Sequence, residues 1–229
     1  MKFIPGPAFS AASGSQGGTV FSHNRYGAYT RSRVIPVNPN TAAQQAAHAD
    51  FAAQSTAWGD RTESEQRAWF TWAANNPITD SLGQQQILAG NAAFIQINTR
   101  LARADAATLT APPVASAPDA LLTLTLTGDI GAGNFGIVFT PTPLDASLHI
   151  WARAAVVNSD GINYVTNLLR QVTISGGAQV SPLDNQTDIE VSFGALAVAQ
   201  VVHQFVSVFD SVTGLLSVPR RARVVVTST

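Results

Sequence analysis

Residues 17–45 read GGTVFSHNRYGAYTRSRVIPVNPNTAAQQ, and the organisation of the chain is most easily followed outward from this stretch. Thr19–Phe21 and Gly27–Val37 are two runs typical of extended strands. The polar segment Ser22–Arg25 between them suits a turn, and Gly27 can take a positive φ where the turn requires one. The pattern predicts a β-hairpin, or a hooked arm, at the N-terminus.

The second strand of this hairpin is expected to present a cationic face. Side chains alternate between the two faces of a strand, so one face carries Tyr29, Arg31, Arg33 and Ile35. Guanidinium groups suit carboxylates and phosphates equally well. The face can therefore bind an acidic protein surface or a nucleic acid. A solvated edge strand, charged to discourage aggregation, is the alternative.

The distribution of charge favours an acidic protein as the partner. The chain before Asp50 has no carboxylate, and its basic residues are Lys2, Arg25, Arg31 and Arg33. From Asp50 onward nine basic residues face fourteen acidic ones, a formal balance of minus five. A basic arm and an acidic body are complementary. We therefore expect the arm to contact a neighbouring copy of the chain through Arg25, Tyr29, Arg31 and Arg33.

Three helices are expected, over residues 42–58, 63–74 and 90–103. The first follows the turn-forming pair Asn38-Pro39 and ends at Gly59. Thr62 and Glu65 have the spacing of a capping box at the start of the second. Apolar residues at helical spacing predict a shared core. Its expected members are Phe51, Trp58, Trp69, Trp72, Ala73, Phe94, Ile97 and Leu101.

The remainder of the chain has the residue pattern of a β-domain. Residues 105–119 are rich in Ala, Thr and Pro and predict a linker. Seven strands are expected beyond it, over 121–127, 135–140, 148–157, 164–175, 189–193, 197–209 and 222–227. Seven short strands separated by turn residues are typical of an immunoglobulin-like or fibronectin-III-like sandwich. The predicted class is α+β, with an arm (1–40), a helical unit (41–104), the linker (105–119) and the sandwich (120–229).

No stretch of the sequence has the pattern of a catalytic, cofactor or metal site. The four histidines, His23, His48, His149 and His203, stand far apart. The oxygen-bearing run 184–190 lacks the spacing of a calcium loop, and the Gly-rich segment 128–133 lacks the lysine and helix start of a phosphate loop. Arg100 and Arg103 are too few for a DNA-reading helix with its phosphate clamps. We expect no enzyme activity, no cofactor and no nucleic-acid partner.

Targeting signals are not apparent in the sequence. Pro5, Gly6 and Pro7 interrupt the apolar core that a signal peptide needs, and no run of 18 apolar residues predicts a membrane span. The chain has no cysteine, so it can form neither disulfides nor a thiolate zinc site. We expect synthesis in the cytoplasm and no insertion into a membrane.

Three motifs together resemble a family of uncharacterised proteins encoded in bacterial and phage genomes. They are GTVFSxNRxGxYxRxRxxPxNPxTxxQ from Gly18, TESEQRAW at 62–69, and the Asn91, Phe94, Asn98 pattern. The resemblance covers about 17–101 and implies a virion component such as a decoration, capsid-associated or tail protein. Its implied location is the virion or a similar assembled particle, and its implied partners are its own copies and other virion structural proteins. It implies no catalytic residue.

Two other functions stay open at this point. The first is a binding module in which loops of the sandwich engage carbohydrate or a host surface. The candidate loop residues are Asn158, Asp160, Asn163, Asp184 and Asp188. The second is a hydrolase whose site is assembled from dispersed residues. Self-association that depends on salt would favour the structural function. Retention of the monomeric chain on a glycan surface would favour the binding module, and only turnover of a substrate would support the hydrolase.

Overall fold

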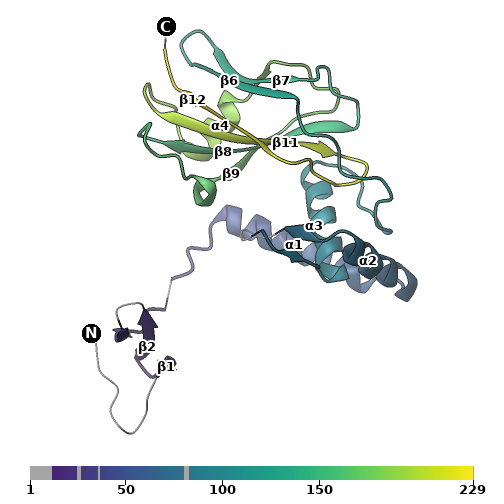
Figure 1. Ribbon diagram of the computed structural model, residues 1–229, viewed down its shortest axis with the longest axis vertical. Coiled ribbons are helices and arrows are strands. Elements are labelled where there is room, and N and C mark those ends of the chain that lie inside the picture. Colours follow the sequence, from purple (N-terminus) through teal and green to yellow (C-terminus); the bar gives the residue numbers. More distant parts are fainter. Residues whose placement is uncertain (1–11, 25–26, 36, 80–82, 229) are drawn as a thin grey trace. The chain divides into compact units, whose positions relative to one another are not determined.

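A computed structural model describes residues 12–24, 27–35, 37–79 and 83–228 (Figure 1). The chain divides into two compact units, Met1–Ala46 and Ala47–Thr229.

The N-terminal unit contains a three-stranded antiparallel sheet in the order β1-β2-β3. Its strands are β1 (Gly14–Gln16), β2 (Thr19–Asn24) and β3 (Gly27–Ser32). The predicted hairpin is confirmed, although β2 continues through residues 22–24, where the sequence pattern predicts the turn. The second strand ends at Ser32 rather than Val37. The register places Ser32 opposite Thr19, the first residue of β2, so the residues that follow have no strand to pair with.

The three predicted helices are present: α1 (Ala42–Gly59), α2 (Glu63–Asn75) and α3 (Gly90–Arg103). A two-residue ladder of β4 (Ile78–Thr79) and β5 (Gln85–Gln86) lies between α2 and α3. The capping box at α2 is confirmed. The Thr62 backbone N–H donates to Glu65 Oε2 at 2.8 Å, and the Glu65 N–H donates to Thr62 Oγ1 at 3.4 Å. These two bonds satisfy amides that the first turn of the helix leaves without a partner.

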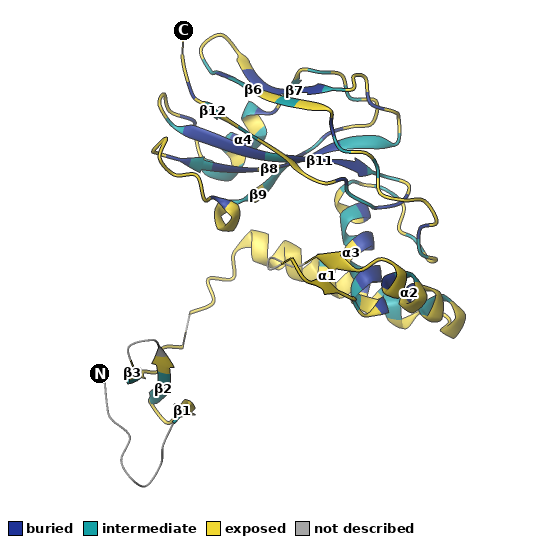
Figure 2. Cartoon of the chain, viewed as in Figure 1, coloured by how far each residue is buried: buried dark blue, intermediate teal, exposed yellow. Residues whose placement is uncertain are grey.

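The helices pack around α3. The Phe94 ring lies 5.4 Å from the rings of both Trp58 and Trp69, centroid to centroid. Phe51, which we expected in this core, is instead 59% exposed. Only Ala57 and Trp58 of α1 join the hydrophobic cluster, so Phe51, two turns earlier, lies beyond the contact. Figure 2 shows nearly the whole of α1 in the colour of exposed residues.

Two antiparallel sheets form the rest of the second unit. The three-stranded sheet has the order β10-β7-β6, from β6 (Thr123–Asp129), β7 (Asn134–Thr140) and β10 (Leu183–Asp184). The four-stranded sheet has the order β12-β11-β8-β9, from β8 (Leu148–Val157), β9 (Arg170–Ile174), β11 (Val201–Asp210) and β12 (Arg220–Val225). The fold is therefore mixed α and β, as predicted.

The sheets meet at one edge, where a parallel bridge joins Asp129 to Thr227. The Thr227 N–H donates to the Gly128 carbonyl at 2.8 Å, and the Ile130 N–H donates to the Thr227 carbonyl at 2.9 Å. A Cβ at Gly128 would lie 2.9 Å from the Val225 carbonyl oxygen, so this approach requires glycine.

The sequence prediction is wrong for one strand and too long for two others, of which the strand expected over 197–209 begins only at Val201. Residues 189–193 lie in a helix, α4 (Gln186–Phe193), rather than a strand. The run alternates apolar and polar residues, but Ile189 alone is buried, and the helix ends at Gly194, whose φ is 89°. The expected strand over 164–175 is divided into a short 3₁₀ helix, η1 (Thr166–Leu168), and β9.

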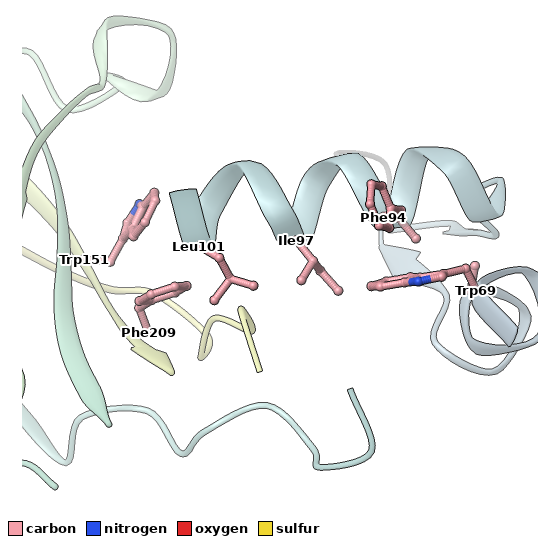
Figure 3. Packing of buried hydrophobic residues seen from close by; sticks show 8 residues of the cluster. Trp69, Phe94, Ile97, Leu101, Trp151 and Phe209 are labelled. Atoms are coloured by element: carbon pink, nitrogen blue, oxygen red, sulfur yellow. The ribbon is translucent and has the colours of Figure 1, made fainter. Parts of the chain in front are cut away.

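The core of the second unit is continuous from the helices to the sheets. Between the sheets, Ile137 and Phe139 pack with Ile150 and Val206. A separate cluster joins the helices to the outer face of the four-stranded sheet, and Figure 3 labels the larger of its side chains. They are Trp69, Phe94, Ile97, Leu101, Trp151 and Phe209. Because one cluster contains residues of α2, α3, β8 and β11, the helices and the sheets are expected to unfold together.

Candidate functional site

The cationic face of the hairpin is the first candidate surface. Tyr29 lies opposite Ser22 and is partly buried, whereas Arg31 lies opposite Val20 and is exposed. Arg33 follows the strand; its backbone N–H donates to the Gly18 carbonyl at 2.8 Å, and the residue is exposed. No ion pair within the described part of the chain involves Arg31 or Arg33. Arg25, the fourth predicted contact residue, lies outside the described residues.

Three apolar residues follow the arginines, and their exposure was not expected from the sequence. Val34, Ile35 and Val37 are 80%, 76% and 90% exposed. The sequence pattern placed them in a strand, where half of them would be covered. We define residues 31–37 as the arm segment. It combines two arginines with three exposed aliphatic side chains, a composition that suits burial against a partner.

The first predicted loop, between β8 and η1, is held against the chain. Its Asp160 carboxylate accepts a hydrogen bond from Arg223 Nη1 at 2.7 Å, and the Asn163 carbonyl accepts one from Arg221 Nη2 at 2.9 Å. The Asn158 amide oxygen accepts from Gln200 at 3.0 Å. The side chains expected to meet a ligand at Asn158 and Asp160 therefore have partners within the molecule.

The other two candidate loop residues, Asp184 and Asp188, lie in β10 and in α4 rather than in a loop, and both have partners within the molecule. Asp184 accepts from the Gln186 backbone N–H at 3.0 Å, and Asp188 accepts from Thr173 Oγ1 at 2.7 Å. Over the described residues, no hydrogen bond joins these two aspartates to the first loop. No group of three or more His, Asp or Glu side chains in that part of the chain is placed to hold a metal ion. This arrangement gives no support to a carbohydrate site built from both loops.

A groove that the sequence did not reveal lies where four segments of the second unit meet. Its volume is about 560 Å³. Its walls come from the linker before β6, the segment after β7, the start of β8 and the end of β11. The lining residues are Ser116, Ala117, Pro118, Asp119, Ala120, Leu122, Pro141, Leu144, Asp145, Leu148, Val208 and Asp210. We call it the acidic groove, because it has three carboxylates and no basic residue.

The three carboxylates of the acidic groove differ in their freedom to bind a ligand. Asp210 accepts from the Val212 N–H at 2.9 Å and from Thr213 Oγ1 at 2.8 Å, so each of its oxygens is engaged. Asp119 and Asp145 are exposed, and their carboxylates make no hydrogen bond or ion pair within the described residues. Two free carboxylates above apolar walls can bind a cationic group that also carries apolar surface.

His203, on β11, is buried beneath the β8–η1 loop. Its exposure is 0%, and neither ring nitrogen has a hydrogen-bond partner in the described structure, although the backbone of Ile162 lies close by. Burial lowers the pKa of His203, and the nearby Arg221 and Arg223 lower it further, while Asp160 acts in the opposite direction. The imidazole is therefore held in its neutral form.

The depressed pKa of His203 predicts that acid weakens the fold. Below a pH of about 6.5 the unfolded chain binds a proton at this position more readily than the native chain does. The free energy of unfolding should therefore fall as the pH is lowered from about 6.5 towards the lowered native pKa. His203→Leu should remove this part of the pH dependence. It should also stabilise the chain by about 1 kcal/mol at pH 7.5, because it removes two unsatisfied nitrogens.

Urea unfolding of both chains at pH 7.5 and pH 5.0 measures this effect. We expect the advantage of the His203→Leu chain to grow at the lower pH. An advantage that stays constant or shrinks would show that the native fold does not lower the pKa of His203.

The chain matches no protein-family model, no curated protein and no solved structure. Within the described residues, no helix has both the length and the apolar character needed to span a bilayer.

Proposed function

We propose that the chain is a non-enzymatic structural protein of a phage-like virion, or of a similar homopolymeric assembly. Within a virion it would be a decoration, capsid-associated or tail component. Contacts of the N-terminal arm with neighbouring subunits hold the assembly together. One observation carries this proposal: the chain has a separate N-terminal unit with four basic residues and no acidic one, and the exposed arm segment lies within it.

The composition of the arm segment supports this function on energetic grounds. Burying exposed aliphatic side chains gains about 25 cal/mol for each Å² of apolar surface removed from water. The two arginines of the arm segment, Arg31 and Arg33, can orient it on a partner through bidentate contacts with carboxylates. The remainder of the chain supplies a net acidic partner surface, with nine basic residues against fourteen acidic ones.

We further propose that the two sheets form a sandwich of the immunoglobulin or fibronectin-III kind. If β6, β7, β8, β9, β10, β11 and β12 correspond to strands A, B, C, C′, E, F and G, the sheets have the orders A-B-E and C′-C-F-G. The parallel bridge then joins Asp129, at the end of the first strand, to Thr227, which follows the last strand. In an assembly, such a domain would present its loops on the surface of the particle.

The mass of the chain in solution tests the structural function. We expect the full chain to self-associate at about 50 mM salt and to dissociate at about 500 mM salt, because salt screens contacts between exposed charges. A chain that begins at Pro39 lacks the hairpin and the arm segment and should be monomeric at both salt concentrations. Light scattering after gel filtration gives these masses directly. Compact monomers for both chains at low salt would exclude assembly through the arm.

A further inference from the structure

We infer that the acidic groove of one subunit is the receptor for the arm segment of a second copy of this chain. The inference rests on the proposed function and adds to it the surface on which the arm docks. In this arrangement Arg31 and Arg33 bind Asp119 and Asp145, while Val34 and neighbouring aliphatic side chains lie on the apolar walls.

The chemistry of the groove selects a cationic peptide as its ligand. Its twelve lining residues include three aspartates and no Lys, Arg or His. Apolar residues fill most of the remaining wall, and Leu122 among them is 69% exposed. The aspartates belong to no group placed to hold a metal ion within the described residues. A metal ion needs carboxylate ligands that converge on one point. An arginine side chain is long and flexible, so its carboxylate partners need not converge.

The arm segment has the complementary features in one short stretch. Residues 33–35 and 37 form no helix or strand, and 33–35 follow directly from an extended strand. Five residues in an extended conformation, such as 31–35 in the bound state, would span about 16 Å at about 3.3 Å per residue. Its arginines have no ion-pair partner within the described chain, and its three aliphatic side chains are at least 76% exposed. An extended peptide that places alternate side chains in a groove is a common mode of recognition.

Charge reversal in the full chain tests the inference. Asp119→Lys with Asp145→Lys should raise the dissociation constant of self-association on the order of 100-fold, because each arginine then faces a like charge. The matched control is Asp60→Lys with Glu63→Lys, which changes the net charge equally but lies outside the groove. The exposed ion pair of Glu63 with Arg67 contributes little to stability, so the control should fold. Circular dichroism and the unfolding midpoint confirm the native fold of each variant.

Mixing experiments determine which copy provides the arm. A chain with Arg31→Glu and Arg33→Glu retains a native groove, and a chain with Asp119→Lys and Asp145→Lys retains a native arm. Each should be monomeric alone, and a mixture of the two should associate in equal numbers, because the native arm of one meets the native groove of the other and the reversed arm meets the reversed groove. Combining all four substitutions in one chain should restore association, since the charges are then complementary again.

The outcomes separate this inference from the proposed function. If the arm reversal gives monomers but the groove reversal assembles like its control, the arm is the assembly element and the groove is not its receptor. If both reversals give monomers and their mixture forms no complex, docking in a second copy is excluded. If neither reversal changes the mass of an assembling wild-type chain, the proposed role of the arm also fails.

Discussion

Replacing Arg31 and Arg33 by glutamate is expected to leave the chain monomeric at about 0.1 M salt, where the wild-type chain self-associates. The two substitutions reverse the charge at two exposed guanidinium groups and leave the backbone ladder of β3 in place. They change the net charge of the N-terminal unit from plus four to zero. Truncating one partner of a hydrogen-bonded charge pair that is buried in an interface costs about 2–5 kcal/mol, and reversal adds repulsion to that loss. Two reversals should therefore weaken association by more than 100-fold.

The control is a chain with Arg67→Glu and Arg220→Glu. It has the same net charge as the arm variant, but both substitutions are exposed positions of the second unit. Sedimentation velocity at several protein concentrations measures the mass of each chain. Equal loss of association in the two variants would show that only net charge matters, and an unchanged mass of the arm variant would exclude the arginines from the interface.

Salt provides a second measurement on the same chains. At about 0.15 M ionic strength charges are screened beyond about 8 Å. The wild-type dissociation constant should therefore rise with salt, whereas the residual association of the arm variant should depend on salt much less. The contribution from burial of Val34, Ile35 and Val37 has the opposite dependence on salt. Salts that are strongly excluded from protein surfaces, such as sulfate, strengthen apolar contacts and so lower the dissociation constant. Chloride and sulfate at equal ionic strength thus separate the two contributions to the contact.

The elements that sequence patterns predicted correctly are those fixed by local chemistry. The bounds of α3 follow from its apolar spacing, and the start of α2 follows from the reciprocal bonds between Thr62 and Glu65. The strand over 148–157 was also predicted with its observed bounds. In each case residues within one or two turns, or within one strand, contain the whole signal.

The features that were missed depend on contacts between distant segments. The alternation in residues 189–193 suits a strand, but these residues form the helix α4, which packs beside β9 and buries Ile189. Phe51 has helical spacing with Trp58, yet only Ala57 and Trp58 of α1 reach the hydrophobic cluster. The acidic groove brings Asp119, Asp145 and Asp210 together from separate segments, which no local pattern reveals.

The candidate surfaces also differ in how far a local sequence pattern predicts them. Alternation along β3 was sufficient to place Tyr29 and Arg31 on one face, because the period of a strand is a local property. The partners of Asp160 and Asp188 were not predictable, since Arg223 and Thr173 reach them from other strands. A polar loop in a sequence therefore does not indicate whether its side chains face a ligand or hold the fold together.

Trp69→Ala is expected to have the largest effect on stability of any single substitution considered. Trp69 is completely buried, its ring meets Phe94 edge-on at 5.4 Å, and its indole N–H donates to the Thr110 carbonyl at 2.9 Å. Removing the ring leaves a cavity and an unpaired carbonyl, and such truncations cost about 3–5 kcal/mol. For a domain of this size that loss lowers the melting temperature by about 10 °C.

The same substitution tests whether the helices and the sheets form one cooperative body. Trp69 belongs to the cluster that includes Trp151 of β8 and Phe209 of β11, so loosening α2 should destabilise the sheets as well. Urea unfolding followed by far-UV circular dichroism and by tryptophan fluorescence should then give coincident transitions in both chains. Phe51→Ala is the matched control, and its cost should be below about 0.5 kcal/mol because the ring is exposed. Separate transitions for the two signals would mean that the helices unfold independently. In that case the sheets that form the acidic groove would not be stabilised by the helices, and the groove would bind the arm of a second copy without that support.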